Sequence, residues 1–312
     1  MNVKKVDGRV LGPVLAGFFI MGFCDIVAPI TGRIAAEFPE ELQGAVSFLP
    51  TMVFLWFLIL STPVAALMNR IGRRATALWG YLFTFAGLLL PYAAGPGYGL
   101  GWYFAGFGLL GIGNTILQVS LNPLLTNVVD SRALSSSLTA GQVIKAVSSF
   151  SGPFIAAFAA SKLGNWVWMF PIFAGISLVS ALWLMATPID EGPAERTSSA
   201  GELLAVLRDR KITMLFLGIV AIVGIDVGLN TLAPKLLIER CDMPLEQAGY
   251  GSSVYFFCRV VGAFVGSLLL TRLSDRKYYV SHMLLGLVVL CALYFADSRY
   301  AVLAGLGVAG FA

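Results

Sequence analysis

Long apolar segments, repeated along almost the whole chain, are the feature that most restricts its fold. Nine of them occupy residues 12–35, 44–68, 75–94, 98–128, 134–161, 165–187, 212–237, 247–271 and 278–296, and a tenth opens near Tyr300. A helix of about 20 apolar residues spans the hydrocarbon core of a bilayer. Only 12% of the residues are charged, whereas soluble domains carry about 25%. The sequence therefore predicts an all-α integral membrane protein embedded in a lipid bilayer.

The distribution of lysine and arginine predicts how these spans are oriented. With the N-terminus in the cytoplasm, fourteen basic residues fall on the cytoplasmic side. Five fall on the opposite side: Arg33, Lys162, Lys235, Arg240 and Arg299. This asymmetry follows the positive-inside rule. We therefore expect a cytoplasmic N-terminus in a bacterial inner membrane. The net charge of +4 gives no reason to expect a nucleic-acid partner.

The chain divides near its middle. Residues 188–210 are polar and contain Pro, Gly and Ser, which predicts a cytoplasmic linker. The segments on its two sides echo each other, because the Ala-Pro pairs that end at Pro29 and Pro234 are 205 positions apart. A repeat of this size predicts two six-helix bundles related by a pseudo-two-fold axis. We expect an N-terminal bundle at 1–187 and a partial C-terminal bundle at 211–312, truncated by about 80 residues.

Charged residues occur inside the apolar segments. Asp25 lies in the first segment and Asp226 in the seventh, at similar places in the two halves, and Lys145 and Arg259 are the basic residues inside spans. A charge at mid-membrane costs several kcal/mol and is functional by default. These residues predict a polar cavity that admits a small polar solute. Asp25 is the candidate for proton coupling.

Polar side chains four residues apart form stripes on the same helices, because such residues share a helix face. The candidate substrate-binding residues taken from these stripes are Gln118, Asn122, Gln142, Lys145, Asp226, Asn230, Tyr255 and Arg259. Amides beside aromatic rings suit a neutral polyol, whereas Lys145 either binds an anionic substrate such as a sugar acid or neutralises Asp25. The alternative for the amides is interhelical hydrogen bonding that only holds the bundle together.

Residues 65–74, AALMNRIGRR, resemble the signature G-x-L-x-D-R-x-G-R-R that joins the second and third helices in the major facilitator superfamily. Ala65 replaces the first glycine, and Asn69 replaces the aspartate that helps to hold the cytoplasmic gate. The resemblance implies two bundles that give alternating access to a central site. It also implies a gate formed by Asn69, Arg70, Gly72, Arg73 and Arg74. Alternatively, these arginines are only cytoplasmic anchors.

Within that superfamily the chain is similar to the fucose–proton symporter group. Four motifs carry the similarity, at residues 25–29, 118–123, 223–227 and 258–262. The group has an acid in helix 1, which Asp25 matches, and an acid in helix 4, where this chain has Gln118. The resemblance implies transport of a sugar, with Asp25 taking part in proton coupling.

Other chemistries have no support in the sequence. The four cysteines show no metal-binding or redox spacing, and no phosphate loop or catalytic triad is visible. We therefore expect no enzyme activity, no cofactor and no metal. The expected function is secondary active transport of a sugar or sugar-like solute, coupled to protons or sodium. The alternatives are an exporter of drugs or metabolites, and a membrane receptor that does not transport.

Overall fold

The structure is a computed structural model that describes residues 8–94, 99–129, 131–191, 205–206, 208–269 and 274–312. Nearly all of these residues lie in helices, and no strand occurs among them. Eight helical stretches of the described chain are long and apolar enough to cross a membrane: 9–35, 40–71, 73–93, 101–128, 137–163, 166–186, 210–241 and 276–294. The predicted all-helical membrane fold is therefore confirmed.

The first half of the chain forms one group of helices around a single apolar core. Its elements are α1 (Gly8–Met21), α2 (Phe23–Ala35), α3 (Glu40–Val46), α4 (Leu49–Ile71), α5 (Arg73–Ala94), α6 (Gly101–Val128), α7 (Ser131–Leu163), the 3-10 turn η1 (Trp166–Trp168) and α8 (Met169–Ala186). Buried aromatic residues from several helices meet in this core, including Phe23 of α2, Phe107 of α6 and Phe173 of α8. The predicted span at 44–68 begins in α3 and continues as α4.

Gly22 joins the two helices of the first span. The amide N–H of Gly22 donates to Phe19 and that of Asp25 donates to Gly22, which is the i to i−3 pattern of a tightened turn. A Cβ atom at Gly22 would lie 2.5 Å from the carbonyl oxygen of Lys145 and 2.6 Å from Cβ of Ser148. Only glycine fits this close approach, and it brings α2 against the middle of α7.

The second half has its own, smaller core. Its helices are α10 (Arg210–Cys241), α11 (Leu245–Ala248), α12 (Tyr250–Leu269), α13 (Asp275–Tyr294) and α14 (Arg299–Phe311). The core joins Ala233 and Leu237 of α10 to Val302 and Leu306 of α14. In its first half, α10 exposes large apolar residues around the helix, from Met214 to Val223, as expected of a lipid-facing surface.

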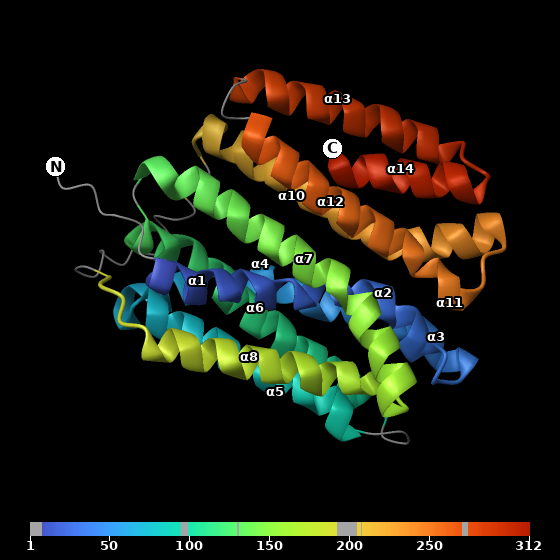
Figure 1. Ribbon diagram of the computed structural model, residues 1–312, viewed down its shortest axis with the longest axis horizontal. Coiled ribbons are helices and arrows are strands. Elements are labelled where there is room, and N and C mark those ends of the chain that lie inside the picture. The colour runs from blue at the N-terminus through green and yellow to red at the C-terminus, as the bar shows by residue number, and fades with distance from the viewer. Residues whose placement is uncertain (1–7, 95–98, 130, 192–204, 207, 270–273) are drawn as a thin grey trace.

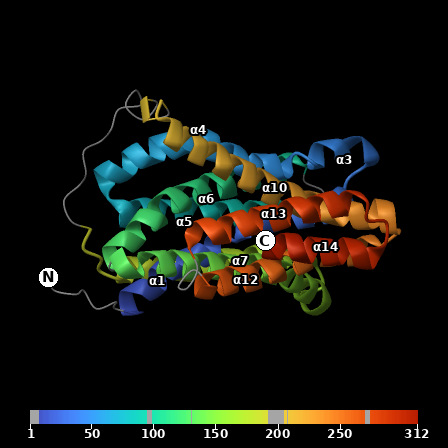
Figure 2. The same ribbon diagram turned by 90° about the horizontal axis from the view of Figure 1, so that it is seen from above.

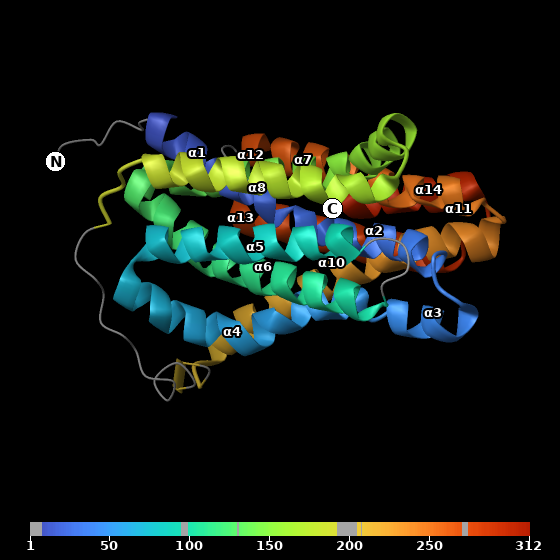
Figure 3. The ribbon, with the colours of Figure 1, turned by 90° about the horizontal axis from the view of Figure 1, so that it is seen from below.

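The long helices run nearly parallel to one another, and the short helices α3 and α11 lie at the end opposite the N-terminus (Figure 1). The two halves meet where α7 packs along α12 and where α2 packs against α10. Seen from above, α7 and α12 lie together on one side of the molecule (Figure 2). The turn between α4 and α5 lies at the same end as the N-terminus (Figure 3).

Candidate functional site

Asp25 of α2 forms a buried ion pair with Lys145 of α7. The two side chains are 11% and 13% exposed, and Nζ of Lys145 lies 3.5 Å from Oδ2 of Asp25. Ser149, one turn further along α7, donates a hydrogen bond of 2.9 Å to the same carboxylate oxygen. The close approach at Gly22 makes this contact possible. The sequence left two alternatives for Lys145, binding an anionic substrate or neutralising Asp25. In this structure Lys145 is paired with Asp25.

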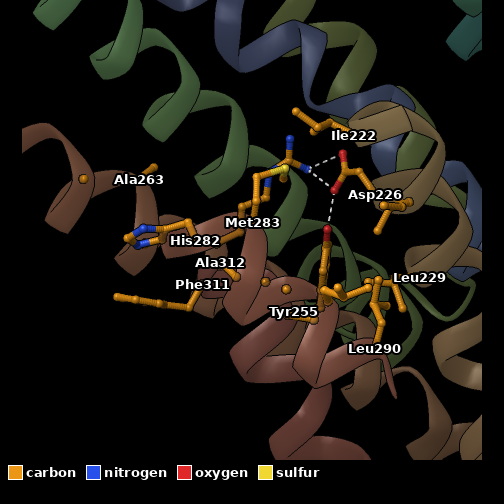
Figure 4. Close-up of a pocket in the computed structure, with 18 of the residues that line it drawn as sticks. Ile222, Asp226, Leu229, Tyr255, Ala263, His282, Met283, Leu290, Phe311 and Ala312 are labelled. Carbon is orange, nitrogen blue, oxygen red and sulfur yellow. Dashed lines mark hydrogen bonds and ion pairs between the residues drawn. The ribbon is translucent and has the colours of Figure 1, made fainter. Parts of the chain in front are cut away.

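Asp226 of α10 forms a second ion pair, with Arg259 of α12. Nη1 of Arg259 lies 2.8 Å from each carboxylate oxygen, and the hydroxyl group of Tyr255 donates to Oδ1. Figure 4 shows Asp226 and Tyr255 directed toward each other, with dashed lines that mark these contacts. The group lies on the wall of a cavity of about 680 Å³ among α10, α12, α13 and α14, whose other lining residues are mainly apolar.

Each ion pair reduces the free-energy cost of placing a charged side chain in the membrane interior. One charge alone in a protein interior within the bilayer is costly, and breaking a buried pair by removing one partner costs about 3–5 kcal/mol. Two acids and two bases are thus gathered near the interface of the two halves, with no net charge when all four are ionised.

Asn230 joins the two halves at this level. It lies one turn after Asp226 on α10, and its Nδ2 donates a 2.9 Å hydrogen bond to the backbone oxygen of Asp25. The hydroxyl group of Ser252 in α12 donates to the backbone oxygen of Asn230 at 3.4 Å. Helices from both halves therefore share one polar contact network.

The repeated sequence also relates Asn230 to Asp25. Asp25 and Asp226 lie at similar places in the two halves, but the register of the repeat differs by one helical turn. Residues 25–29 read D-I-V-A-P and residues 230–234 read N-T-L-A-P. Asn230 is therefore the positional counterpart of Asp25. Asp226 lies one turn earlier, where it contacts Arg259 and Tyr255.

A second cavity, which we call the vestibule, lies between the two halves. Its volume is about 590 Å³, and its lining comes from α2, α3, α4, α7, α10 and α12. Both members of the repeated proline pair, Pro29 and Pro234, line it, as do Arg33 and Lys235. Pro50, at the start of α4, also lines the vestibule, whereas α4 ends at Ile71, so the vestibule lies at the end of the molecule away from the α4–α5 turn.

The predicted amides are less closely gathered. Nδ2 of Asn122 donates to the backbone oxygen of Gln118 in its own helix, and its Oδ1 is buried without a hydrogen-bond partner. The Oδ1 atoms of Asn114 and Asn230 are also buried and unpartnered. Gln142 is exposed on α7. In the described chain, Gln118, Asn122 and Gln142 line neither of the two cavities.

The predicted gate residues surround the turn from α4 to α5. Gly72 has φ of +92°, a left-handed conformation that favours glycine. The guanidinium of Arg73 donates to the backbone oxygen of Pro123 at 3.0 Å and to the side chain of Asn127, so it holds the end of α6. Arg74 donates to backbone oxygens at the end of α8. Asn69 and Arg70 lie in the last turn of α4.

Sequence reasoning missed Glu191 at this turn. Its carboxylate accepts hydrogen bonds from the backbone N–H groups of Arg73 and Arg74, the latter at 2.8 Å. An acid at the start of α5 satisfies N–H groups that have no partner within the helix. Nδ2 of Asn127 donates to the backbone oxygen of Glu191 at 3.0 Å. Glu191 falls in the range predicted as a linker, where a single acid carries no periodic signal.

Comparison with known proteins identifies the family. The family model described as "Major Facilitator Superfamily" matches residues 14–312 of this chain. The chain belongs to the major facilitator superfamily. It is therefore a membrane transporter rather than an enzyme, as the sequence predicted.

Solved structures and curated relatives agree with this assignment. The crystal structure of the Escherichia coli fucose:proton symporter matches with a TM-score of 0.74 at 16% identity, over 96% of this chain and 80% of that one. The xylose transporter of E. coli in an inward-open conformation matches with a TM-score of 0.68 at 13% identity, over 97% and 79%. A Helicobacter pylori protein, provisionally named a glucose/galactose transporter, is 20% identical over 96% of this chain and 77% of its own. Identities this low show the fold alone, and that fold is the one implied by the resemblance to the fucose–proton symporter group.

Proposed function

We propose that the protein carries a sugar or sugar-like solute across the bacterial inner membrane, driven by a proton gradient and by alternating access. The observation that carries the proposal is the buried Asp25–Lys145 pair, contacted by Asn230 from the other half. Residues 1–187 and 211–312 are the proposed moving bundles, joined by 188–210. The N-terminus and the gate at Asn69, Arg70, Gly72, Arg73 and Arg74 are proposed to face the cytoplasm.

The Asp25–Lys145 pair offers a mechanism for coupling. When Asp25 is ionised, it neutralises Lys145 and accepts the hydrogen bond of Ser149. When Asp25 binds a proton, Lys145 loses its partner and becomes available to another oxygen ligand. The same pair disfavours sodium as the coupling ion, because an ammonium group 3.5 Å from the carboxylate repels a second cation. Protonation and substrate binding are thereby linked at one place.

Sugar as the substrate class is supported by unsatisfied polar atoms. A buried acceptor without a hydrogen bond costs about 1–3 kcal/mol, and the Oδ1 atoms of Asn122 and Asn230 are in this state. Neither residue lines either of the two cavities in this conformation, so the proposal requires alternating access to open the site, where hydroxyl groups of a bound sugar would satisfy both atoms. Gln118, Gln142, Lys145, Asp226, Tyr255 and Arg259 remain the other proposed substrate-binding residues. The names of the relatives, which refer to fucose, xylose and glucose/galactose, point the same way.

Uptake into proteoliposomes tests the proposal. With the interior alkaline, we expect labelled galactose, glucose, fucose or xylose to accumulate above equilibrium, and a protonophore to abolish the accumulation. Uptake that is unaffected by the protonophore would exclude proton coupling. Sugar-dependent thermal stabilisation without any flux would favour the receptor alternative. Absence of both binding and flux for every sugar would remove sugar as the substrate class.

A further inference from the structure

The vestibule carries two basic side chains, and no ion pair joins either of them to a described residue. Arg33 extends from α2 and Lys235 from α10, so each half contributes one cation to the lining. Neither forms a hydrogen bond or ion pair with any residue that the structure describes. No carboxylate is found among the described residues that line the vestibule.

The two acids nearest in sequence to these bases, Glu37 and Glu239, form no ion pair with them in the described chain. Glu37 lies one turn after Arg33, at the spacing that favours an ion pair. Its carboxylate instead accepts hydrogen bonds from Nε1 of Trp166 at 2.8 Å and from the hydroxyl group of Tyr103 at 3.2 Å. Glu239 has the same spacing from Lys235 and makes no ion pair with it in the described chain. Glu37 and Glu239 keep their negative charge but lie outside the vestibule lining, so the charged side chains that face the cavity are the two bases.

The ion pairs nearer the middle of the helices do not offset this charge. Asp25 and Asp226 are each matched by a base, so the two pairs add no net negative charge. Among the described residues that line the vestibule, the charged side chains are those of Arg33 and Lys235. A cleft with charge of one sign and walls of low dielectric constant focuses the field, and it can raise the local concentration of a counter-ion and its on-rate by about 10–10³-fold.

We propose that the vestibule selects sugars that carry a carboxylate, such as hexuronates, over neutral sugars, with Arg33 and Lys235 as the residues that determine this preference. The inference rests on the proposed transport function and narrows its substrate class. In the proposed cycle, protonation of Asp25 frees Lys145, which supplies a third cation deeper in the protein than the vestibule lining. A carboxylate attracted by Arg33 and Lys235 then meets a partner next to the proton-binding group.

Galacturonate and galactose form a suitable pair of probes, because they share ring stereochemistry and differ in a carboxylate in place of the C6 hydroxymethyl group. We expect purified protein to bind and transport labelled galacturonate with an affinity at least tenfold higher than that for galactose at low salt. Salt at about 0.5 M, which screens exposed charges, should weaken galacturonate binding and leave galactose unchanged. The neutral methyl ester of galacturonate should compete no better than galactose.

Variants assign the effect to the two residues. The double variant Arg33→Gln/Lys235→Gln should lose most of the tenfold preference by raising KM for galacturonate, whereas Arg33→Lys should retain it. Lys162→Gln is the matched control, because Lys162 is an exposed base at the end of α7 outside the vestibule lining. Equal affinities of the wild-type protein for the two sugars would overturn the inference and leave the sugar-transport proposal standing. An equal loss of both sugars in the double variant, with Lys162→Gln unaffected, would also overturn it. If the wild-type protein neither binds nor transports either sugar, both proposals fail.

Discussion

Replacing Lys145 by alanine removes the cation that accompanies Asp25 and should move the pH dependence of transport. At the 3.5 Å separation of the two charges, an effective dielectric constant of about 20 gives an attraction of about 5 kcal/mol. One pH unit corresponds to about 1.4 kcal/mol, so the upper limit of the shift in the transport profile is about 3.5 units. Ser149 still donates its hydrogen bond to the ionised carboxylate, so we expect the transport profile to shift by less than this limit, about 1–3 units.

The direction of the shift follows from charge. Without the neighbouring cation, Asp25 holds its proton to higher pH, so the alkaline limb of the uptake profile should move upward. Proton release on the other side becomes harder, and the maximal rate should therefore fall. Initial rates of sugar uptake in proteoliposomes, measured across a series of equal pH values on both sides, give the profile.

Two control variants isolate the charge effect. Lys145→Arg keeps the positive charge and should retain a profile close to that of the wild-type protein. Ser149→Ala removes one hydrogen bond to the carboxylate and should give a smaller upward shift than Lys145→Ala. If Lys145→Ala changes neither the pH profile nor the preference among sugars, the pair has no part in coupling and the reasoning is refuted.

Three further predictions concern other parts of the structure. Asp25→Asn should abolish accumulation against a gradient but leave sugar exchange across the membrane measurable, and full uphill transport by this variant would contradict the coupling proposal. Gly72→Ala should lower the melting temperature in detergent, because its Cβ would lie 2.9 Å from Oε2 of Glu191 at a φ of +92°; the expected loss of stability is about 1–3 kcal/mol. Arg259→Ala leaves the partly buried Asp226 without its cation, so the loss of stability should stay below the loss of about 3–5 kcal/mol for a fully buried pair; adding Asp226→Asn should recover part of that stability in a double-mutant cycle.

The spans and the gate turn could be predicted from the sequence because their signals are local. An apolar segment of about 20 residues forms a transmembrane helix in a bilayer, because a helix satisfies all of its backbone hydrogen bonds internally. The predicted span at 98–128 differs from α6 by only three residues at its start. Gly72 could be read as special because a glycine recurs there in the superfamily signature, and its positive φ supplies the physical reason.

The pairing of charges could not be derived in the same way. Whether Lys145 faces Asp25 depends on how α7 packs against α2. The close contact at Gly22 sets that packing. In the sequence, Gly22 is one of 34 glycines, and nothing distinguishes it from the others. The repeated D/N-x-x-A-P pattern relates Asn230 to Asp25. The acid at Asp226, one helical turn earlier, suggests a different register for the repeat. Glu191 gave no signal of its own, because its role depends on two N–H groups more than a hundred residues earlier in the chain.

The balance of charge in the two ion pairs has an electrical consequence. With Asp25 and Asp226 ionised, the two pairs carry no net charge, so the membrane potential performs little work on them when the empty protein changes conformation. Protonation of Asp25 leaves one excess positive charge, and moving an elementary charge through 100 mV is worth about 2.3 kcal/mol. A neutral sugar would leave that charge in place, and an interior-negative voltage would then accelerate its entry. A monoanionic sugar acid would cancel the charge, so the same protein would be sensitive to voltage with one cargo and insensitive to it with the other.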